Sequence, residues 1–149
     1  MAVTAEIYAR FFQNALKGNI DDLEGAGSLE CMLLDTNHSF SEADEFVSDI
    51  VANEVATGAE EDYERQTLTG VSISQGLDPD DNEINLDAAN INFGSEVTIS
   101  ANYAVIYQSQ IDDTDSPLMF HVNFDGEQSS VDGTFELQVH ADGLFDVVT

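Results

Sequence analysis

Hydrophobic residues recur with a helical period in two segments of the first 58 residues. Between residues 7 and 16 they are spaced three and four apart, which places them on one face of a helix. Thr4 is the predicted N-cap of this helix and Gly18 its predicted end. A second helix is predicted near residues 41–57, with Ser41 as its N-cap. The predicted buried stripes are Ile7, Tyr8, Phe11, Phe12, Ala15 and Leu16 in the first helix, and Phe46, Val47, Ile50, Val51 and Val55 in the second.

The rest of the chain has the pattern of β-strands. The apolar run at residues 29–34 has the length of a buried strand rather than a helix. After residue 67, apolar and polar residues alternate, and short segments rich in Asp, Asn, Gly and Pro separate the alternating runs. The predicted strands are 29–34, 68–74, 84–86, 91–93, 97–108, 118–124, 134–139 and 144–148, and the predicted turns are 78–82, 112–117, 125–126, 132–133 and 142–143.

Two of the predicted strands indicate how the sheets are built. Residues 97–108 are apolar on both faces, which is typical of a central strand, whereas residues 118–124 and 134–139 alternate as strands with one buried face do. The sequence therefore predicts a mainly β (α+β) fold. We expect an antiparallel β-sandwich with one N-terminal helix and one further helix near residues 41–57, in a single domain spanning 1–149.

The charge balance indicates the salt concentration at which this fold is expected to be stable. Thirty Asp and Glu oppose three Lys and Arg, giving a formal net charge of -27, and the acids are spread along the whole chain. The hydrophobic fraction of 42% is that of an ordinary globular protein, so the chain is expected to fold. Like charge at this density weakens a compact state in dilute buffer. Molar salt shortens the Debye length from about 10 Å at 0.1 M to about 3 Å at 1 M, so the sequence predicts a halophilic protein.

The same charge excludes several partners. An acidic surface repels phosphate, so nucleic acid and anionic membranes are not expected to bind, and no apolar segment is long enough to span a bilayer. No cofactor is predicted, and surface acids are expected to attract monovalent and divalent cations only nonspecifically. The single cysteine, Cys31, lies in an apolar run and is predicted to be a buried, unreactive thiol.

The search for catalytic chemistry gives no complete site. No nucleophile with a base, no dinucleotide fingerprint and no phosphate-binding loop is recognisable, so no catalytic and no cofactor-binding residues are predicted. Asp78, Asp80 and Asn82 resemble the start of a calcium loop. However, Glu83 occupies the position of the turn glycine, and no bidentate acid ends the loop. These residues are therefore interpreted as a solvated acidic turn.

His121 and His140 are the second candidate metal ligands. Both fall on the polar positions of their strands, so both are predicted to face outward and would face one another if those strands paired. A two-histidine metal site is the alternative to ordinary surface histidines, but the sequence indicates no third ligand. No metal site is therefore predicted.

The order of many core and turn residues resembles a family of small virion structural proteins of tailed bacteriophages and haloarchaeal tailed viruses. The matching residues are Phe12, ALKG at 15–18, MLLD at 32–35, HSF at 38–40, EFVSDI at 45–50, NEVATG at 53–58, Tyr63, Arg65, Leu68, YAVIY at 103–107, Pro117, Leu118, Asn123, Phe124 and GTF at 133–135. The resemblance covers nearly the whole chain and departs from the family at an acidic insert, residues 59–62. It carries a fold and not a catalytic site.

This resemblance implies a role in a virus particle. The expected function is that of a non-enzymatic capsid decoration, minor capsid or turret subunit, assembled into the virion in the host cytoplasm. The alternatives are a tail, collar or baseplate attachment subunit, or a β-sandwich module that binds host glycans or a receptor. The implied partners are other virion proteins, such as the major capsid protein, and further copies of the chain. The candidate interface residues are Phe11, Phe12, Tyr63, Leu144 and Phe145.

Overall fold

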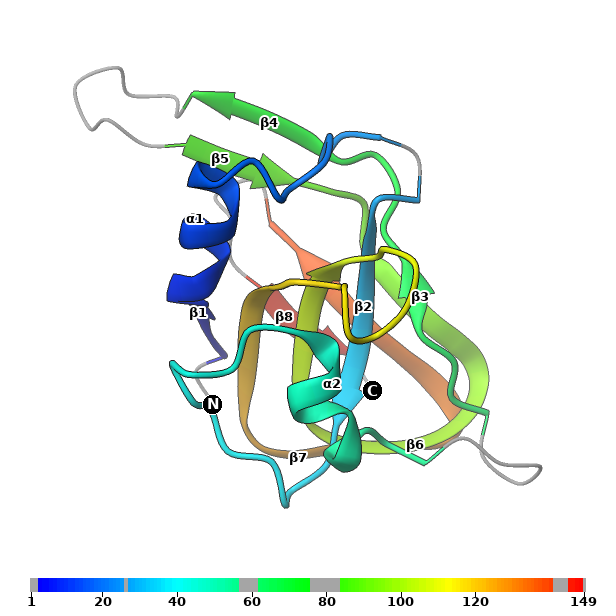
Figure 1. The fold of residues 1–149 in the computed structure, drawn as a ribbon. Coiled ribbons are helices and arrows are strands. Elements are labelled where there is room, and N and C mark those ends of the chain that lie inside the picture. Colours follow the sequence, from blue (N-terminus) through cyan, green and yellow to red (C-terminus); the bar gives the residue numbers. More distant parts are fainter. Residues whose placement is uncertain (1–2, 26, 57–61, 76–83, 141–144, 149) are drawn as a thin grey trace.

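The computed structural model describes residues 3–25, 27–56, 62–75, 84–140 and 145–148. Strands dominate it, with two short helices, which confirms the mainly β, α+β prediction (Figure 1). The elements are β1 Thr4–Ile7, α1 Ala9–Leu16, β2 Leu29–Leu34, α2 Val47–Ile50, the 3₁₀ helix η1 Val51–Asn53, β3 Gln66–Thr67, β4 Ser72–Gln75, β5 Ile84–Asp87, β6 Ile91–Gln108, β7 Leu118–Val139 and β8 Phe145–Val148. No helix in these residues is long and apolar enough to cross a membrane.

The main sheet has six antiparallel strands and is organised around one long hairpin. Its order is β1-β7-β6-β2-β3, with β8 also paired to β7, while β4 and β5 form a separate two-stranded sheet. β6 lies between β7 and β2, which confirms that residues 97–108 belong to a central strand. β1 pairs with the first part of β7 and β8 with its last part.

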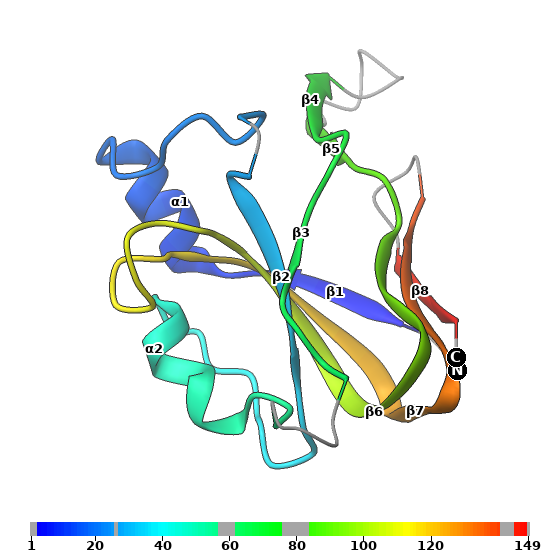
Figure 2. The ribbon, with the colours of Figure 1, turned by 90° about the vertical axis from the view of Figure 1, so that its right-hand side faces the viewer.

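The β6–β7 hairpin bends, and this makes the layers pack on one another. Figure 2 shows the bent part of the hairpin and β8 on one side of β2, with α1 and α2 on the other side. Phe124 from the first part of β7 contacts Phe135 from its last part, with ring centroids 6.4 Å apart. Phe93 of β6 lies between Phe135 and Tyr63, at centroid distances of 5.9 and 6.1 Å. The long strands therefore supply both walls of one core.

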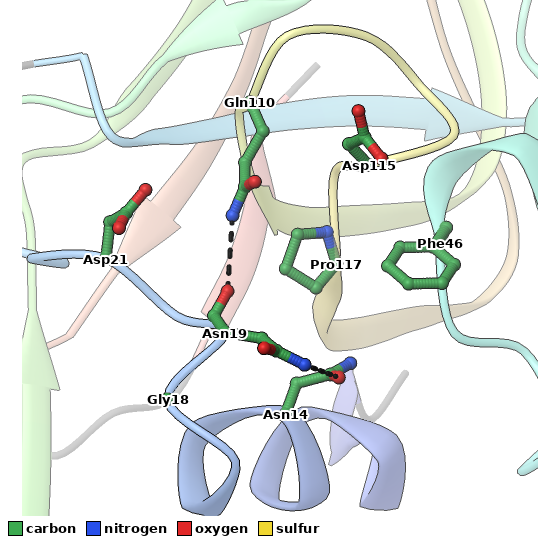
Figure 3. Close-up of a pocket in the computed structure, with 8 residues that line it drawn as sticks. All are labelled: Asn14, Gly18, Asn19, Asp21, Phe46, Gln110, Asp115 and Pro117. Carbon is green, nitrogen blue, oxygen red and sulfur yellow. Dashed lines mark hydrogen bonds between the residues drawn. The ribbon is translucent and has the colours of Figure 1, made fainter.

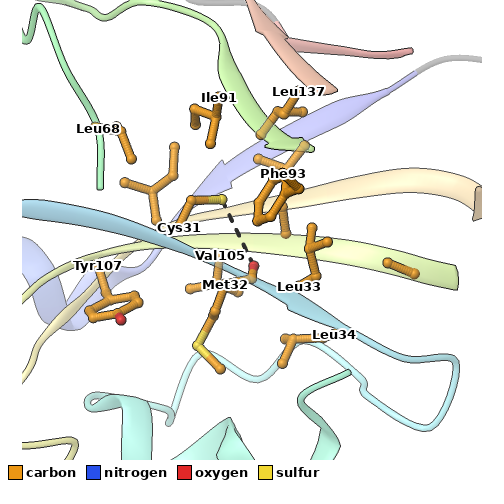
Figure 4. Close-up of a cluster of buried hydrophobic side chains, with 14 of the residues drawn as sticks. Cys31, Met32, Leu33, Leu34, Leu68, Ile91, Phe93, Val105, Tyr107 and Leu137 are labelled. Carbon is orange, nitrogen blue, oxygen red and sulfur yellow. Dashed lines mark hydrogen bonds between the residues drawn. The ribbon is translucent and has the colours of Figure 1, made fainter. Parts of the chain in front are cut away.

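β2 faces two cores, so its run of buried residues has no polar alternation. Cys31 and Leu33 point toward the bent hairpin, whereas Met32 and Leu34 point toward the side of α2 (Figure 4). Each of these four side chains is fully buried. The predicted bounds of this strand, residues 29–34, are confirmed. Its consecutive apolar residues are explained by burial on both faces of the strand.

The predicted turns at 125–126 and 132–133 are wrong, because both pairs lie inside β7. Asp125 and Asp132 have positive φ angles of 57° and 47°, yet the strand continues through them. The ladder to β6 accommodates the irregular residues by register shifts. Aspartate tolerates the left-handed region, and such residues serve a bulge as well as a turn. The predicted strands 91–93 and 97–108 also form one strand, β6, which continues through an irregular position at Gly94.

Both predicted helices begin later than expected. Residues 4–7 form β1, which pairs with β7, and Tyr8 N–H continues the contact by donating to the carbonyl of Met119 at 3.0 Å. Sheet pairing thus overrides the local helical period. The second helix begins at Val47, where Asp49 accepts hydrogen bonds from the backbone N–H groups of Glu45 and Phe46 at 2.9 and 3.0 Å. Ser41, the predicted cap, instead closes a turn with Ala43.

Candidate functional site

α1 presents an apolar strip to solvent. Phe11 and Asn14 turn toward the interior, so the positions on the opposite side of the helix face outward. Phe12 is 54% exposed and Leu16 is 90% exposed. These two residues are four apart and therefore lie one above the other on the same face. Two large apolar side chains exposed together on a protein of net charge -27 make this helix a candidate contact surface.

Two of the three cationic side chains of the sequence lie on the same helix. Arg10 and Lys17 are seven residues apart, so they share one side of α1, about 130° around the helix from the strip of Phe12 and Leu16, with Gln13 between the two. Arg10 donates a hydrogen bond to Gln13, and neither cation forms an ion pair with another described residue. We call Arg10, Phe12, Gln13, Leu16 and Lys17 the α1 surface; all five are exposed. It combines apolar contact area with two of the three Lys and Arg side chains of the chain.

The third cation, Arg65, has a structural role instead. Its guanidinium contacts Glu54 at 2.7 Å and Asp113 at 2.7 Å, and lies 5.7 Å from the ring centroid of Tyr107. Tyr63 adds a hydrogen bond to Glu54 at 2.8 Å and accepts one from the backbone of Leu33 at 3.0 Å. Arg65 therefore neutralises two acids within the fold and is not available to a partner.

A polar pocket of about 350 Å³ lies between the end of α1 and the loop that connects β6 to β7 (Figure 3). Asn19 donates to Asn14 at 3.3 Å, and Gln110 donates to the carbonyl of Asn19 at 3.4 Å. The lining residues are Asn14, Gly18, Asn19, Asp21, Phe46, Gln110, Asp115 and Pro117. Amide and carboxylate groups beside one aromatic ring suit a neutral, hydroxyl-rich ligand better than an anion.

The main sheet also buries a pair of histidines on the helix side. His121 of β7 is 2% exposed, and His38, from the segment between β2 and α2, is 5% exposed. Their ring centroids are 5.2 Å apart. Phe40 and Tyr103 also contact His121, at centroid distances of 5.0 and 5.2 Å. Both ring nitrogens of His121, Nε2 of His38 and the hydroxyl of Tyr8 are buried without a hydrogen-bond partner.

Burial determines how these groups titrate. Desolvation, with a smaller contribution from the neighbouring His38, lowers the pKa of His121 to about 4. Desolvation also lowers the pKa of His38, opposed by the carboxylate of Asp35. Burial raises the pKa of the Tyr8 hydroxyl well above its usual range. The cluster is therefore uncharged at neutral pH, with two neutral imidazoles.

Several predicted site residues need correction. His121 does not face outward, because the segment containing His38 and Phe40 covers that face of β7. His140 is exposed, but it cannot face His121 as expected, because residues 118–124 and 134–139 belong to one strand and do not pair with each other. Phe11 and Tyr63 were predicted as interface residues, but both are buried in the core and are not exposed to a partner. Phe12, predicted for the same role, is exposed.

The remaining candidates fall at or beyond the limits of the structure. Asp78, Asp80, Asn82 and Leu144 lie outside the described residues, and Phe145 is described only as a backbone position of β8. In the parts of the chain that are described, no three His, Cys, Asp or Glu side chains are grouped to hold a metal ion. Cys31 is buried and desolvation raises the pKa of its thiol, which agrees with the predicted unreactive cysteine.

Sequence reasoning missed two features. The position of Arg10 and Lys17 seven residues apart was readable as a shared helical face once all three cations were located. The His38–His121 pair carried no such signal, because 83 positions separate the two residues in the sequence. Comparisons with protein-family models, with curated proteins and with solved structures find no match to this chain.

Proposed function

We propose that this chain is a non-enzymatic structural protein of a haloarchaeal tailed virus, acting as a capsid decoration, minor capsid or turret subunit. The observation that carries the proposal is the α1 surface, an exposed side of the helix that has Phe12 and Leu16 at one edge and Arg10 and Lys17 at the other. A subunit of a particle needs a contact surface rather than a reaction centre. The resemblance of core and turn residues to small virion proteins supports the same role.

The salt concentration determines which contacts such a protein can make. At about 1 M salt the Debye length is about 3 Å, so repulsion between two acidic proteins is screened beyond direct contact. Burial of Phe12 and Leu16 then contributes fully, because the hydrophobic contribution does not depend on charge. Arg10 and Lys17 add ion pairs only where a carboxylate touches them. The expected partner surface is therefore apolar at its centre and acidic at its rim.

Symmetry argues for a different virion protein as the occupant of the α1 surface. In a two-fold contact between copies of this chain, the same patch meets itself. Arg10 and Lys17 of one copy would then approach those of the other, which costs free energy. We therefore propose that the α1 surface contacts an acidic site on the major capsid protein or an equivalent shell protein. Copies of the chain would then stand side by side on the particle.

The proposal is tested by adding purified protein to particles that lack it, in molar KCl. Wild-type protein is expected to bind the particles in many copies, detected by quantitative mass spectrometry after sedimentation. The double variant F12S/L16S should bind roughly tenfold more weakly or worse, because central apolar contacts dominate protein interfaces. The charge-reversal variant R10E/K17E should also bind more weakly, because it repels an acidic rim.

The matched control is V131S/I73S, which removes two exposed apolar side chains of strands rather than of α1. It is expected to bind as the wild type does. Circular dichroism and the thermal midpoint of each variant show whether the fold is kept. Absence of the chain from purified particles, or normal binding by folded F12S/L16S, would overturn the proposal. Electron cryomicroscopy of decorated particles separates a head position from a tail, collar or baseplate position.

A second candidate function rests on the pocket. Its three amides and Phe46 provide the hydrogen bonds and the aromatic contact that a saccharide requires, so a host-glycan-binding module is the alternative. Binding of neutral glycans by the isolated protein, lost in Q110A and Asn19→Ala but kept in F12S/L16S, would favour this function. If the isolated protein also failed to enter particles, the structural role would be replaced by it.

A further inference from the structure

Four buried polar atoms in one cluster are without hydrogen-bond partners among the described residues. They are both ring nitrogens of His121, Nε2 of His38 and the Tyr8 hydroxyl. A neutral imidazole has one N–H donor and one lone pair, so both sides of His121 are unsatisfied. Leaving a buried donor or acceptor unpaired costs about 1–3 kcal/mol each. Four such groups in one place are therefore expected to share a partner that is not a protein side chain.

The spacing of the two histidines suits a metal ion. An imidazole nitrogen lies about 2.0–2.1 Å from zinc, which places the ring centroid about 3.2 Å from the ion. Two such ligands at a tetrahedral angle have centroids about 5.2 Å apart. The centroids of His38 and His121 are 5.2 Å apart. Ordinary aromatic packing gives similar separations, so the unpartnered nitrogens, and not the distance, distinguish the two interpretations.

The surroundings favour a cation held by nitrogen ligands. Asp35 acts electrostatically on His38, and Asp44 on Tyr8, so negative charge lies next to the cluster. The rings of Phe40 and Tyr103 pack against His121 and exclude bulk water. Imidazole nitrogens select borderline transition metals over Mg²⁺ and Ca²⁺, which prefer oxygen ligands. The site is thus distinct from the surface acids, which bind cations through carboxylates.

We propose that His38 and His121 bind one divalent transition-metal ion, such as Zn²⁺, Ni²⁺, Cu²⁺ or Co²⁺, between the sheet and the segment that follows β2. Water completes the coordination, and the Tyr8 hydroxyl is its hydrogen-bond partner. The ion binds one nitrogen of each ring, so the remaining N–H of His121 donates to a further buried water. The ion fastens residues 35–46 to β7, so its role is structural. This inference does not depend on the role in a particle.

The test uses the full chain, stripped with a chelator and then titrated with Co²⁺ in molar KCl with Mg²⁺ in excess. Magnesium occupies the surface carboxylates, so the remaining Co²⁺ binding reports nitrogen ligands. Co²⁺ is expected to bind at one equivalent and to give the visible absorption of a low-coordinate, nitrogen-ligated ion. Zn²⁺ should displace it and raise the thermal midpoint of the stripped protein.

Three variants separate ligation from packing. H121F and H38F keep an aromatic ring in the cluster and remove the nitrogens, so each should fold and should lose the Co²⁺ spectrum. Y8F removes only the hydroxyl and should weaken binding without abolishing it. H140N, which changes the exposed third histidine, is the matched control and should bind as the wild type does.

The outcomes decide between an ion and a buried water. Absence of stoichiometric Co²⁺ binding by folded wild-type protein would overturn the proposal. Binding by H121F and H38F that equals binding by the wild type would overturn it too. In the first case the nitrogens are satisfied by water only. Loss of binding in H140N alone would place the ion elsewhere. None of these results bears on attachment to particles, which depends on α1.

Discussion

Arg65 connects three segments that are distant in the sequence. It binds Glu54 after η1 and Asp113 in the loop between β6 and β7, and it packs over Tyr107 near the end of β6. Glu54 is held also by Tyr63, and Tyr107 donates a hydrogen bond to Glu30 of β2. The chain has only three Lys and Arg residues, and Arg65 neutralises two carboxylates within the fold. This indicates that Glu54 and Asp113 need a counter-charge for folding.

Replacing Arg65 tests this interpretation. R65A leaves Glu54 and Asp113 facing one another without a cation, and we expect a loss of about 2–3 kcal/mol in the free energy of unfolding. R65K keeps the charge but cannot contact both carboxylates with a rigid fork, so its loss should be smaller. Urea unfolding at constant molar KCl measures both. R10A, on the exposed helix, is the control and should change stability little; an equally small effect of R65A would contradict the interpretation.

His121 gives the fold a dependence on pH in the metal-free protein. Its pKa is about 4 in the folded state and near its ordinary value of 6.5 in the unfolded chain. Above pH 6.5 both states are neutral at this residue, so its burial is unopposed. As the pH falls from 6.5 to about 4, His121 becomes protonated in the unfolded state but stays neutral in the folded state. The free energy of unfolding therefore decreases over this range.

The expected loss from His121 is about 3 kcal/mol across that range. Urea unfolding of chelator-treated wild type and H121F, compared between pH 7 and pH 4 in molar KCl, measures it. Carboxylates titrate in both proteins, so only the difference between the two is interpreted. The free energy of unfolding of H121F should decrease less than that of the wild type as the pH falls. Parallel curves would show that His121 is protonated without penalty and is not buried as described.

At the scale of elements, the bend of the β6–β7 hairpin determines the architecture. Gly94 lies in an irregular part of the ladder, has a φ of 139°, and accepts no Cβ without contact at 2.3 Å with Val97 Cγ1. Its N–H donates to the side chain of Asn92 at 2.7 Å. The backbone can adopt this conformation only because position 94 carries no side chain.

G94A is therefore expected to destabilise the fold by about 2–4 kcal/mol, through both backbone strain and steric overlap. The control G18A has a φ of 76° with nothing within 4 Å of the added methyl group, so it should cost only about 1 kcal/mol. In a V97A background the overlap with Cγ1 disappears but the backbone strain at φ 139° remains, so G94A should cost less than in the wild type and still more than G18A. Urea unfolding of the four variants checks this, and equal losses for G94A in both backgrounds would contradict the steric part.

At the scale of the whole molecule, charge sets the conditions of folding. Thirty acids repel one another in dilute buffer, and the described structure pairs only Arg65 with them. The thermal midpoint is expected to rise as KCl increases from 0.1 to 1 M, since the Debye length falls from about 10 Å to about 3 Å. Sucrose at equal osmolality should not reproduce the full effect. A midpoint that is unchanged by dialysis into low salt would contradict the prediction of halophily.

The sequence predicted those features that depend on a segment's own period. Residues 29–34 are apolar at consecutive positions, and residues 97–108 are apolar on both faces, so strands covered on two sides were predictable without any partner. The outward direction of Phe12 was not predictable in this way, because six apolar side chains in residues 7–16 exceed the width of one buried stripe. Only the position of Phe11 and Asn14 against the core determined which of them remain exposed.

Local periodicity and composition are enough to predict a mainly β, strongly acidic chain with one fully buried strand and a central one. The tertiary structure decided where strands join and which faces are covered. β7 continues through Asp125 and Asp132 because its ladder to β6 resumes after each of them, and this pairing outweighs the local turn preference. His121 is buried because residues 35–46 return over that face. A local pattern records the alternation of one segment, whereas burial depends on what a distant segment places on top of it.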